Sequence, residues 1–467
     1  MTEPNFVSGT VWTGDNLPVL RGINSECVDL IYLDPPFNSN RNYEAPIGSK
    51  AAGAAFKDMW TLDDVDVHEH GELADRNPAA YSVIEAARQA HGKGMMSYLI
   101  FMAVRLIELR RILKPTGSIY LHCDDTAGHY LKLLMDGVFG RLNCRNTIIW
   151  KRQSGNNAGN NFGRIADWLL WYTKSDAFIW NIPYGKLSPE QAKRYRYKEQ
   201  FTGRFYAKED LTAPSTDPAR KFTWRGTTPG GSRGWAYSHE RLEELWNAGL
   251  IHTKTDGKPA LDGRKKYLDQ HPGAKVQNIW TDIQRVGNTA KERVGYPTQK
   301  PLALLDRIIK TSSNKNDFIL DPFCGCATAL VAADRLGRKW AGIDLSELAV
   351  KLVNDRINSD RAVHEKSFGK HIGGNLFGGA IALTNAPKRS DLGNIPNYRT
   401  HRHRLYGEQE GICAGCSTHF PFKVMEVDHI LPRSKGGTDH IDNLQLLCTA
   451  CNKSKGSKTM AQWRALP

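Results

Sequence analysis

The chain has 467 residues, and its 63 lysine and arginine residues against 49 aspartate and glutamate residues give a formal net charge of +14. This length exceeds one ordinary hydrophobic core, so two or three domains are expected. The charge favours a polyanionic partner such as nucleic acid over an acidic small molecule. The longest strongly apolar run, Tyr98 to Val104, is far shorter than the roughly 20 residues that cross a bilayer, so no membrane association is expected.

The N-terminus lacks the charged and apolar regions of a secretory signal, which predicts a cytoplasmic, nucleoid-associated protein in a reducing compartment. The nine cysteines are therefore not expected to form disulfides. Five of them are scattered and predicted to be core residues, namely Cys27, Cys123, Cys144, Cys324 and Cys326. The other four form two Cys-x-x-Cys pairs near the C-terminus.

Strand and helix signals alternate in the first 150 residues. Val28 to Leu33 (VDLIYL) is a continuous apolar run of strand length that ends in Asp34-Pro35-Pro36, where neither strand nor helix can continue. Residues 97–113 have helical spacing and a basic last turn, and residues 118–122 resume strand character after a Pro-Thr-Gly break.

The alternation returns late in the chain, with helices at 302–310, 328–336 and 346–357 and strands at 317–320 and 339–345. This order predicts an α/β fold with a doubly wound, mostly parallel sheet covered by helices. Ligands of such sheets bind at the carboxyl ends of the strands. Two of these strand ends are followed by sequences with potential catalytic or ligand-binding residues, one starting at Asp34 and the other at Asp321.

The tetrapeptide Asp34-Pro35-Pro36-Phe37 offers the groups that amino methylation needs. The lone pair of an aromatic amine is delocalised into its ring, so the nitrogen is a poor nucleophile until it is held. An Asp carboxylate and a proline carbonyl can accept both amine hydrogens, while Phe37 stacks on a base that has left the duplex. The alternative is a proline-terminated strand with an ordinary capping Asp.

A second loop, Asp321 to Thr328 (DPFCGCAT), joins a strand to a helix through small residues, so its backbone can approach the methionine portion of a cofactor closely. Asp344 ends the next strand, roughly 20 positions after the glycine loop, where an acidic residue typically binds ribose hydroxyls. NAD would require a fuller glycine fingerprint. Each loop alone also suits an ordinary α/β protein, whereas the two together indicate methyl transfer.

With these loops in this order, the sequence from about Gly14 to Asp360 resembles the β-class of DNA amino-methyltransferases. The matching stretches are Gly14-Asp15-Asn16, VDLIYLDPPFNS, ELRRILKPTGSIYLHCDD, TIIWKR, YPTQKP at Tyr296 to Pro301, DPFCGCAT and GIDLSE. The resemblance implies a methyltransferase sheet that binds S-adenosylmethionine and double-stranded DNA.

The resemblance also implies roles for single residues. Asp34, Pro35, Pro36 and Phe37 would hold the target base. S-adenosylmethionine would be bound by Asp321, Phe323, Gly325, Thr328, Asp344, Thr298, Gln299 and Lys300. One departure is visible, because the family commonly has Gly-Ser-Gly-Thr where this chain has Gly325-Cys326-Ala327-Thr328.

The first residue of the catalytic loop bears on the substrate. Asp-Pro-Pro is typical of adenine-N6 enzymes in this family and Ser-Pro-Pro of cytosine-N4 enzymes, so Asp34 favours adenine. Methylation of cytosine C5 needs a thiolate, usually in a Pro-Cys dipeptide, and no proline in this chain precedes a cysteine. RNA or protein methylation remains a further alternative.

Residues 151–280 interrupt the α/β rhythm and occupy the family's target-recognition position. Their basic and aromatic residues, such as KRYRYKEQFTGRFYAK from Lys193, suit phosphate contact and base stacking. The alternative is a solvated amphipathic element, and it is the preferred interpretation for a single residue such as Arg196 or Tyr197.

Near the C-terminus, Cys413, Cys416, Cys448 and Cys451 form two Cys-x-x-Cys pairs separated by 31 residues. This spacing predicts a structural Zn²⁺ site in a segment too short to build a core alone.

The segment from about Tyr406 to Lys458 resembles the HNH nucleases, which share a small ββα-metal fold. The resemblance implies that His429 is the general base, that Asp428 and Asn452 hold Mg²⁺ or a similar divalent cation, and that Asn443 supports the loop. The alternative is a zinc-stabilised module that binds DNA without cleaving it.

The sequence therefore predicts a site-specific adenine-N6 DNA methyltransferase of restriction-modification type fused to an HNH endonuclease. The runner-up is an adenine-N6 or cytosine-N4 methyltransferase whose HNH module only binds DNA. The sequence is compatible with a monomer and with a homodimer. The expected segments are a catalytic half (1–150), a target-recognition region (151–280), a cofactor-binding half (281–360), a linker (361–400) and an HNH nuclease-like zinc domain (401–467).

Overall fold

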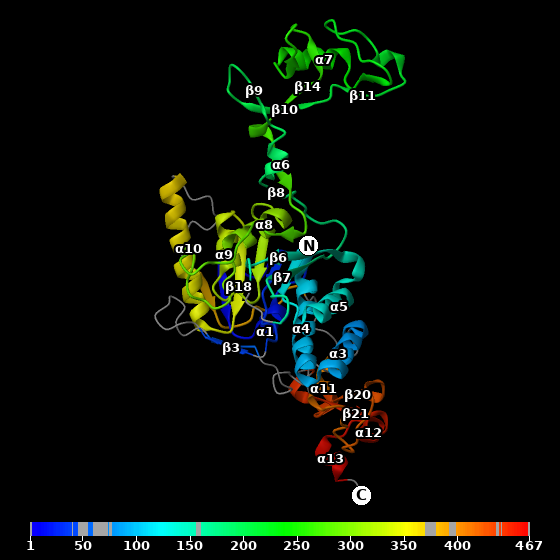
Figure 1. The fold of residues 1–467 in the computed structure, drawn as a ribbon. Helices are drawn as coiled ribbons and strands as arrows, with labels where there is room; N and C mark the ends of the chain where they lie inside the picture. Colours follow the sequence, from blue (N-terminus) through cyan, green and yellow to red (C-terminus); the bar gives the residue numbers. More distant parts are fainter. Residues whose placement is uncertain are drawn as a thin grey trace. The chain divides into compact units, whose positions relative to one another are not determined.

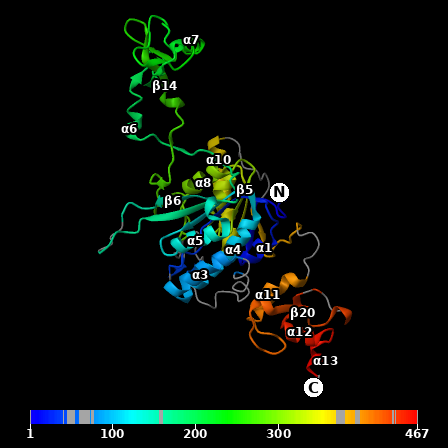
Figure 2. The same ribbon diagram turned by 90° about the vertical axis from the view of Figure 1, so that its right-hand side faces the viewer.

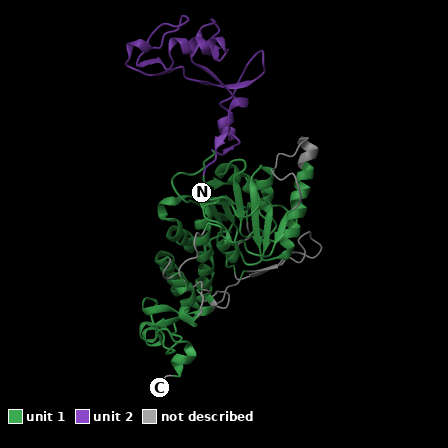
Figure 3. Cartoon of the chain, turned by 180° about the vertical axis from the view of Figure 1, so that it is seen from behind, with its two compact units in different colours: residues 1–181, 278–467 green, residues 182–277 purple. Residues whose placement is uncertain are grey.

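The computed structural model describes residues 2–39, 41–44, 55–58, 73, 77–155, 160–368, 380–391, 398–435, 439 and 441–465. The chain divides into two compact units, one made of residues 1–181 and 278–467 and the other of residues 182–277 (Figure 3). Among the described residues, no helix is both long and apolar enough to span a membrane.

A nine-stranded sheet organises the first unit (Figure 1). Its strand order is β16 (Ile279–Trp280), β6 (Cys144–Lys151), β7 (Ala166–Thr173), β5 (Leu113–Cys123), β2 (Val28–Leu33), β17 (Phe318–Asp321), β18 (Lys339–Asp344), β1 (Thr10–Thr13) and β19 (Ile381–Leu383). All neighbours pair in parallel except β7, which is antiparallel to both β5 and β6. The predicted doubly wound, mostly parallel sheet is confirmed.

The order of the strands reverses between β2 and β17. The chain runs from β2 to β5 in one direction and from β17 to β18 in the other. Right-handed crossovers in opposite directions place their helices on opposite faces of the sheet. The point between β2 and β17 is therefore the switch point at which sheets of this kind bind ligands.

Two groups of helices cover the sheet (Figure 1). One group, whose members contact one another, contains α1 (Asn16–Gly22), α3 (Pro78–His91), α4 (Lys93–Ile112) and α5 (Gly128–Phe139). The other contains α8 (Leu302–Ser312), α9 (Thr328–Arg335) and α10 (Glu347–Phe368). Strands β3 (Arg41–Glu44) and β4 (Ala55–Asp58) pair antiparallel in a separate two-stranded sheet.

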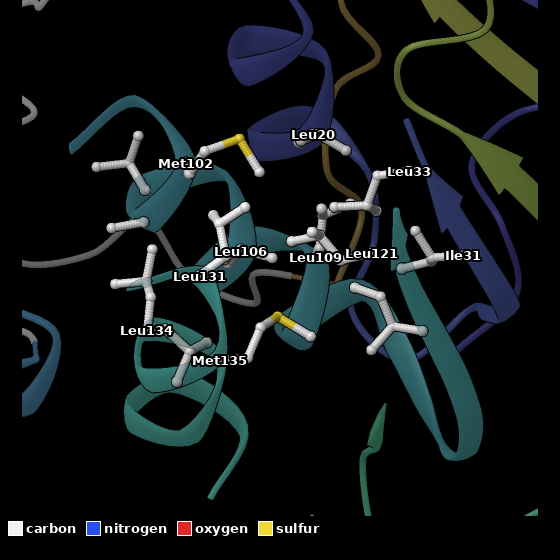
Figure 4. Close-up of a cluster of buried hydrophobic side chains, with 14 of the residues drawn as sticks. Leu20, Ile31, Leu33, Met102, Leu106, Leu109, Leu121, Leu131, Leu134 and Met135 are labelled. Atoms are coloured by element: carbon white, nitrogen blue, oxygen red, sulfur yellow. The ribbon is translucent and has the colours of Figure 1, made fainter. Parts of the chain in front are cut away.

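Strand β2 is buried along its whole length, as expected for a central strand that is covered on both faces. Its apolar side chains join those of α4, α5 and β5 in one core (Figure 4), with Leu20, Ile31, Leu33, Met102, Leu106, Leu109, Leu121, Leu131, Leu134 and Met135 among its members. Local signals set the helix ends. Asn77 caps α3 by accepting a hydrogen bond from the amide of Ala80, and Gly92 ends it with a φ of 82°.

The second unit, residues 182–277, has its own core and a four-stranded antiparallel sheet. The strands of this sheet are β13 (Ile251–Thr253), β14 (Pro259–Tyr267), β10 (Phe205–Glu209) and β9 (Tyr197–Lys198). Its other elements are β8 (Tyr184–Gly185), α6 (Pro189–Ala192), β11 (Thr212–Pro214), β12 (Arg233–Trp235), α7 (His239–Asn247) and β15 (Ala274–Lys275).

This unit is narrower than the predicted region 151–280. The difference arises because β7 inserts between β5 and β6, so residues 166–173 belong to the central sheet. The predicted linker 361–400 also contributes structure, since α10 extends to Phe368 and β19 pairs with β1. Residues 369–379 and 392–397 of that segment lie outside the described part of the chain.

The C-terminal module is a ββα arrangement (Figure 2, orange and red). Strands β20 (Met425–His429) and β21 (Leu444–Cys448) pair antiparallel, and α12 (Thr449–Lys455) follows directly. The flanking helices are α11 (Arg402–Glu408) and α13 (Met460–Arg464). The predicted ββα fold is confirmed.

The core of the second unit depends on Trp235, which is fully buried against Trp224 and donates its indole hydrogen to the carbonyl of Phe222. We expect Trp235→Ala to destabilise this unit by about 3–5 kcal/mol, because it removes a large buried side chain. Hydrogen exchange of the whole chain would show faster exchange in residues 182–277 and unchanged exchange in the central sheet. Phe201→Ala is the control, since Phe201 is 96% exposed and its loss should change stability little.

Candidate active site

The loops that follow β2 and β17 line one cavity of about 430 Å³. Strands β2 and β17 are paired in parallel, with Leu30 opposite Ile319 and Ile31 opposite Leu320, so both chains leave the sheet at the same edge. Asp34 and Asp321 therefore reach the cavity from neighbouring strands, although 286 residues lie between them in the sequence.

All four residues of the tetrapeptide line this cavity. Asp34 accepts a hydrogen bond from Lys300 on Oδ2, with Nζ 2.5 Å away, whereas its buried Oδ1 has no hydrogen-bond partner among the described residues. Phe37 stacks on the imidazole of His122, with ring centroids 5.8 Å apart and planes 30° apart. One carboxylate oxygen and one aromatic ring are thus fixed beside the space where a flat ligand would enter.

His122 belongs to a buried polar chain behind Phe37. Its Nδ1 lies 2.9 Å from the hydroxyl of Tyr32, and its Nε2 lies 3.3 Å from Oδ2 of Asp167. Burial alone would raise the pKa of Asp167, but the hydrogen bond from His122 and the charges of His122 and Arg152 outweigh it and lower that pKa. These groups hold the His122 ring in place, and it in turn supports Phe37.

The sequence analysis did not identify His122 or Asp167. His122 is the penultimate residue of β5, so its position near a strand end was the available signal. Asp167 had no such signal, because its pairing depends on β7 lying beside β5.

The second loop is shaped by two residues with left-handed backbone, Gly325 with a φ of 46° and Ala327 with a φ of 65°. Ala327 takes the position where the resembling family commonly has glycine. An L residue with a side chain pays roughly 1–2 kcal/mol for this conformation. The alanine noted in the sequence therefore adopts a left-handed conformation at a conformational cost.

Asp344 ties this loop to the end of β18. Its Oδ2 accepts a hydrogen bond of 2.8 Å from the amide of Gly325, and its Oδ1 accepts one of 2.9 Å from the amide of Ser346. Asp321 similarly accepts a hydrogen bond of 3.1 Å from the amide of Phe323. Thr328 bonds with its hydroxyl to the buried guanidinium of Arg356, 2.9 Å away.

The residues of the Thr298–Lys300 segment have two different roles. Thr298 and Lys300 line the cavity. Gln299 turns to its own loop, where Oε1 accepts a hydrogen bond from the amide of Val294 and Nε2 donates one to the carbonyl of Glu292. Gln299 therefore fastens the loop that presents its two neighbours.

Acidic side chains predominate among the charged residues of the cavity. Five carboxyl groups line it, those of Asp15, Asp34, Asp58, Asp321 and Asp344, and Lys300 is the one lysine or arginine among its described lining residues. Burial, followed by the nearby carboxylates of Asp34 and Asp344, holds the pKa of Asp321 well above its ordinary value. Burial also raises the pKa of Asp344. Such a site favours a ligand that carries positive charge.

In the C-terminal module, the four cysteine sulfurs of Cys413, Cys416, Cys448 and Cys451 lie within 4.8 Å of one another. Thiolates around a tetrahedral Zn²⁺ have metal–sulfur distances of about 2.3 Å, so their sulfurs lie about 4 Å from one another. The cluster has the donor type and the spacing that a structural zinc ion requires.

His429 and Asn443 lie at the same end of the β20–β21 pair. His429 Nε2 is 2.9 Å from Oδ1 of Asp439, and its ring lies 4.8 Å from that of Tyr398. Asn443 accepts a hydrogen bond from the amide of Leu431 and donates one to its carbonyl, and it thereby supports the loop that follows His429.

Asp428 and Asn452 are engaged with partners that the sequence did not identify. Asp428 is paired with the fully buried Lys455, whose Nζ lies 2.9 Å from Oδ2, and also accepts a hydrogen bond from Gln445. Asn452 donates a hydrogen bond to Glu426, which lies two residues before Asp428 on β20. No signal in the linear sequence links these pairs, since they form only when α12 packs on the hairpin.

Aromatic and basic side chains gather on the small sheet of the second unit. Tyr197 and Tyr206 stack with ring centroids 5.7 Å apart, and Lys208 lies 4.5 Å from the Tyr197 ring. Arg196 covers Tyr197 from 5.2 Å, and Phe201 in the neighbouring turn is almost fully exposed. Tyr206 is buried and supports the Tyr197 ring from below, whereas Arg196 and Phe201 are exposed to solvent.

Comparison with known proteins gives two family matches. A family described as DNA methylase (N6_N4_Mtase) matches residues 28–355, and the HNH endonuclease family matches residues 413–458.

Several curated proteins are similar to the first part of the chain. The type II methyltransferase M.EcaI of Enterobacter cloacae is 31% identical over 355 residues, which cover 75% of this chain and 70% of that protein. The Mod subunit of the type III restriction-modification enzyme StyLTI of Salmonella typhimurium is 30% identical over 71% of this chain and 50% of its own length, so the match spans half of that protein. The DNA adenine methyltransferase YhdJ of Escherichia coli is 24% identical over 73% of this chain and 80% of its own length.

The raised pKa of Asp321 makes a prediction about stability. An acid whose pKa is higher in the folded state loses stability as pH rises from its ordinary pKa to the raised one. We therefore expect Asp321→Asn to stabilise the ligand-free protein, and the gain in melting temperature to be larger at pH 8 than at pH 5. Asp176→Asn, which changes a 91% exposed carboxylate, should bring no gain at either pH. A loss of stability at pH 8 in Asp321→Asn would contradict this account.

Proposed function

The chain belongs to the DNA methylase family, and from this premise we propose that it transfers a methyl group from S-adenosylmethionine to N6 of adenine at specific sites in double-stranded DNA. The observation that carries the proposal is the shared cavity between Asp34-Pro35-Pro36-Phe37 and the loop 321–328. One loop suits a flat base with an amino group. The other suits a cofactor that carries positive charge.

S-adenosylmethionine supplies a methyl group on a positively charged sulfur, and the five carboxyl groups of the cavity complement that charge. The Gly325 loop would lie against the methionine portion, and the carboxylate of Asp344 would accept hydrogen bonds from the ribose hydroxyls. NAD carries two anionic phosphates, and these same carboxylates would repel them. The cavity therefore supports a sulfonium cofactor over a dinucleotide.

The catalytic loop would make the exocyclic amine of the base more nucleophilic. Asp34 Oδ1 and the Pro35 carbonyl would accept its two hydrogens, which draws the nitrogen towards tetrahedral geometry and exposes its lone pair. Phe37 would stack on the flipped base, backed by His122 at 5.8 Å. After transfer the nitrogen would give one of its two protons to the carboxylate of Asp34, which would pass it to water.

Adenine is preferred over cytosine on two grounds. The loop begins with Asp34, which is typical of adenine-N6 enzymes, and YhdJ, which is similar over 73% of this chain, is named a DNA adenine methyltransferase. Cytosine N4 is the second candidate, because it is also an exocyclic amine and would make the same hydrogen bonds. The unit 182–277 would recognise the target sequence through its exposed basic and aromatic residues.

For the C-terminal module we propose metal-dependent DNA cleavage. Asp428 and Asn452 offer oxygen ligands that suit Mg²⁺, which would stabilise charge on the scissile phosphate, and His429 would take the proton of the attacking water. The pair of Asp428 with Lys455 lies where the cation would bind, so metal and ammonium would share one carboxylate. Zinc on the four cysteines would hold the module together. A module that binds DNA without cutting it is the second candidate.

We expect Asp34→Ala to abolish methyl transfer to DNA and to leave the zinc content unchanged, because the variant removes one acceptor of the amine and touches no cysteine. Mass spectrometry of nucleosides from treated DNA would measure the product. The wild-type chain should yield N6-methyladenine, and N4-methylcytosine would favour the second candidate base. Transfer at the wild-type rate in Asp34→Ala would contradict the assigned role.

The nuclease proposal is tested with unmethylated and premethylated plasmid in the presence of Mg²⁺. The wild-type protein should cut DNA, and His429→Ala should slow the cut by about 100-fold or more, as expected for loss of a general base. Cleavage that is absent from both substrates, and unchanged by His429→Ala, would favour the DNA-binding alternative.

A further inference from the structure

We infer that Lys300 is a positioning residue for the methyl acceptor: it holds one oxygen of Asp34, so that the other oxygen faces the cavity as a hydrogen-bond acceptor for an exocyclic amine. This inference rests on the proposed function and deepens it. It differs from the role that the family resemblance implied, in which Lys300 would bind the cofactor.

The contact between the two side chains is short and largely shielded from water. Lys300 Nζ lies 2.5 Å from Asp34 Oδ2, and the two side chains are only 10% and 16% exposed. A pair that is removed from solvent is much more directional than a surface pair, because water neither screens nor replaces it. The carboxylate of Asp34 is therefore held in one orientation before any ligand arrives.

The second oxygen of Asp34 has the opposite character. Oδ1 is buried, lines the cavity with the rest of the residue, and has no hydrogen-bond partner among the described residues. A buried acceptor without a partner is costly to the folded protein. A ligand that brings an N–H group to this position removes that cost, whereas a ligand that brings a carbonyl oxygen meets a like charge.

Lys300 is itself fixed on several sides. It donates a second hydrogen bond of 3.3 Å to the carbonyl of Thr298, and its ammonium lies 5.3 Å from the centre of the Phe37 ring. Both of its hydrogen bonds therefore end on Asp34 and on its own loop, and neither ends on the loop 321–328. Lys300 thus connects the acceptor group and the stacking ring of the base site.

The arrangement also explains how both contacts can exist at once. Lys300 uses Oδ2, the amine would use Oδ1, and neither partner needs to leave for the other to bind. Without Lys300, Asp34 would rotate freely among its rotamers, and both oxygens would repel the other carboxylates of the cavity. We therefore expect the loss of Lys300 to misorient the reacting nitrogen and to leave the affinity for the cofactor unchanged.

The test compares Lys300→Met and Lys300→Arg with the wild-type chain in single-turnover methylation of plasmid DNA at saturating S-adenosylmethionine. We expect Lys300→Met to lower the rate by about 10-fold to 100-fold, as a misplaced catalytic group does. The Kd for S-adenosylmethionine, measured by calorimetry, should change by less than about threefold, because uniform binding is not removed. Lys300→Arg should recover part of the rate, since its guanidinium can also donate to Asp34.

Lys114→Met is the matched control. Lys114 forms the same kind of pair with Asp29, with Nζ 2.9 Å from both carboxylate oxygens, but near the start of β2 and away from the cavity. Its loss should lower stability and leave the rate of the folded protein unchanged.

Two results would overturn the inference. One is a full rate in Lys300→Met at saturating cofactor together with a Kd raised tenfold or more, which would assign Lys300 to the cofactor. The other is a variant equal to the wild type in both measurements. If the wild-type chain itself transfers no methyl group to DNA, the proposed function is rejected, and the inference is rejected with it.

Discussion

The parallel pairing of β2 with β17 is the constraint on which the site depends. Because the two strands run side by side in register, the loops that follow them leave the sheet at one edge and line one cavity. Asp29 secures the other end of the pair, where it binds Lys114 and accepts a hydrogen bond from the amide of Phe318 at the start of β17. A shift of one residue in this register would turn the side chains of β2 to the opposite face of the sheet and misplace Asp34.

The buried acids of the cavity explain why its stability and its function oppose each other. Five carboxyl groups line the cavity, and burial makes the ionisation of Asp321 and Asp344 costly. Lys300 pairs with Asp34, and Arg105 pairs with Asp15. A ligand with a positive centre would favour the ionised forms of Asp321 and Asp344, so part of the cost of burying these two acids would return as affinity.

The sequence was sufficient to predict the elements whose signals are local. The run from Val28 to Leu33 and the proline that stops it predicted β2 residue by residue, and the small residues around Gly325 predicted the second loop. It was insufficient where a role depends on distant pairing. His122 gains its partners only because β7 lies beside β5, and Asp428 meets Lys455 only when α12 packs on its hairpin. The same pairing of β7 moved residues 166–173 out of the expected insert.

The topology of the insert has an evolutionary consequence. The chain leaves the sheet after β7 and re-enters it at β16, which pairs with β6, the neighbour of β7. Residues 182–277 carry their own core, so the sheet does not need them in order to fold. Under the proposed function, recombination at these two junctions would exchange one recognition unit for another and change the DNA sequence that is methylated, while the two loops of the cavity stayed intact.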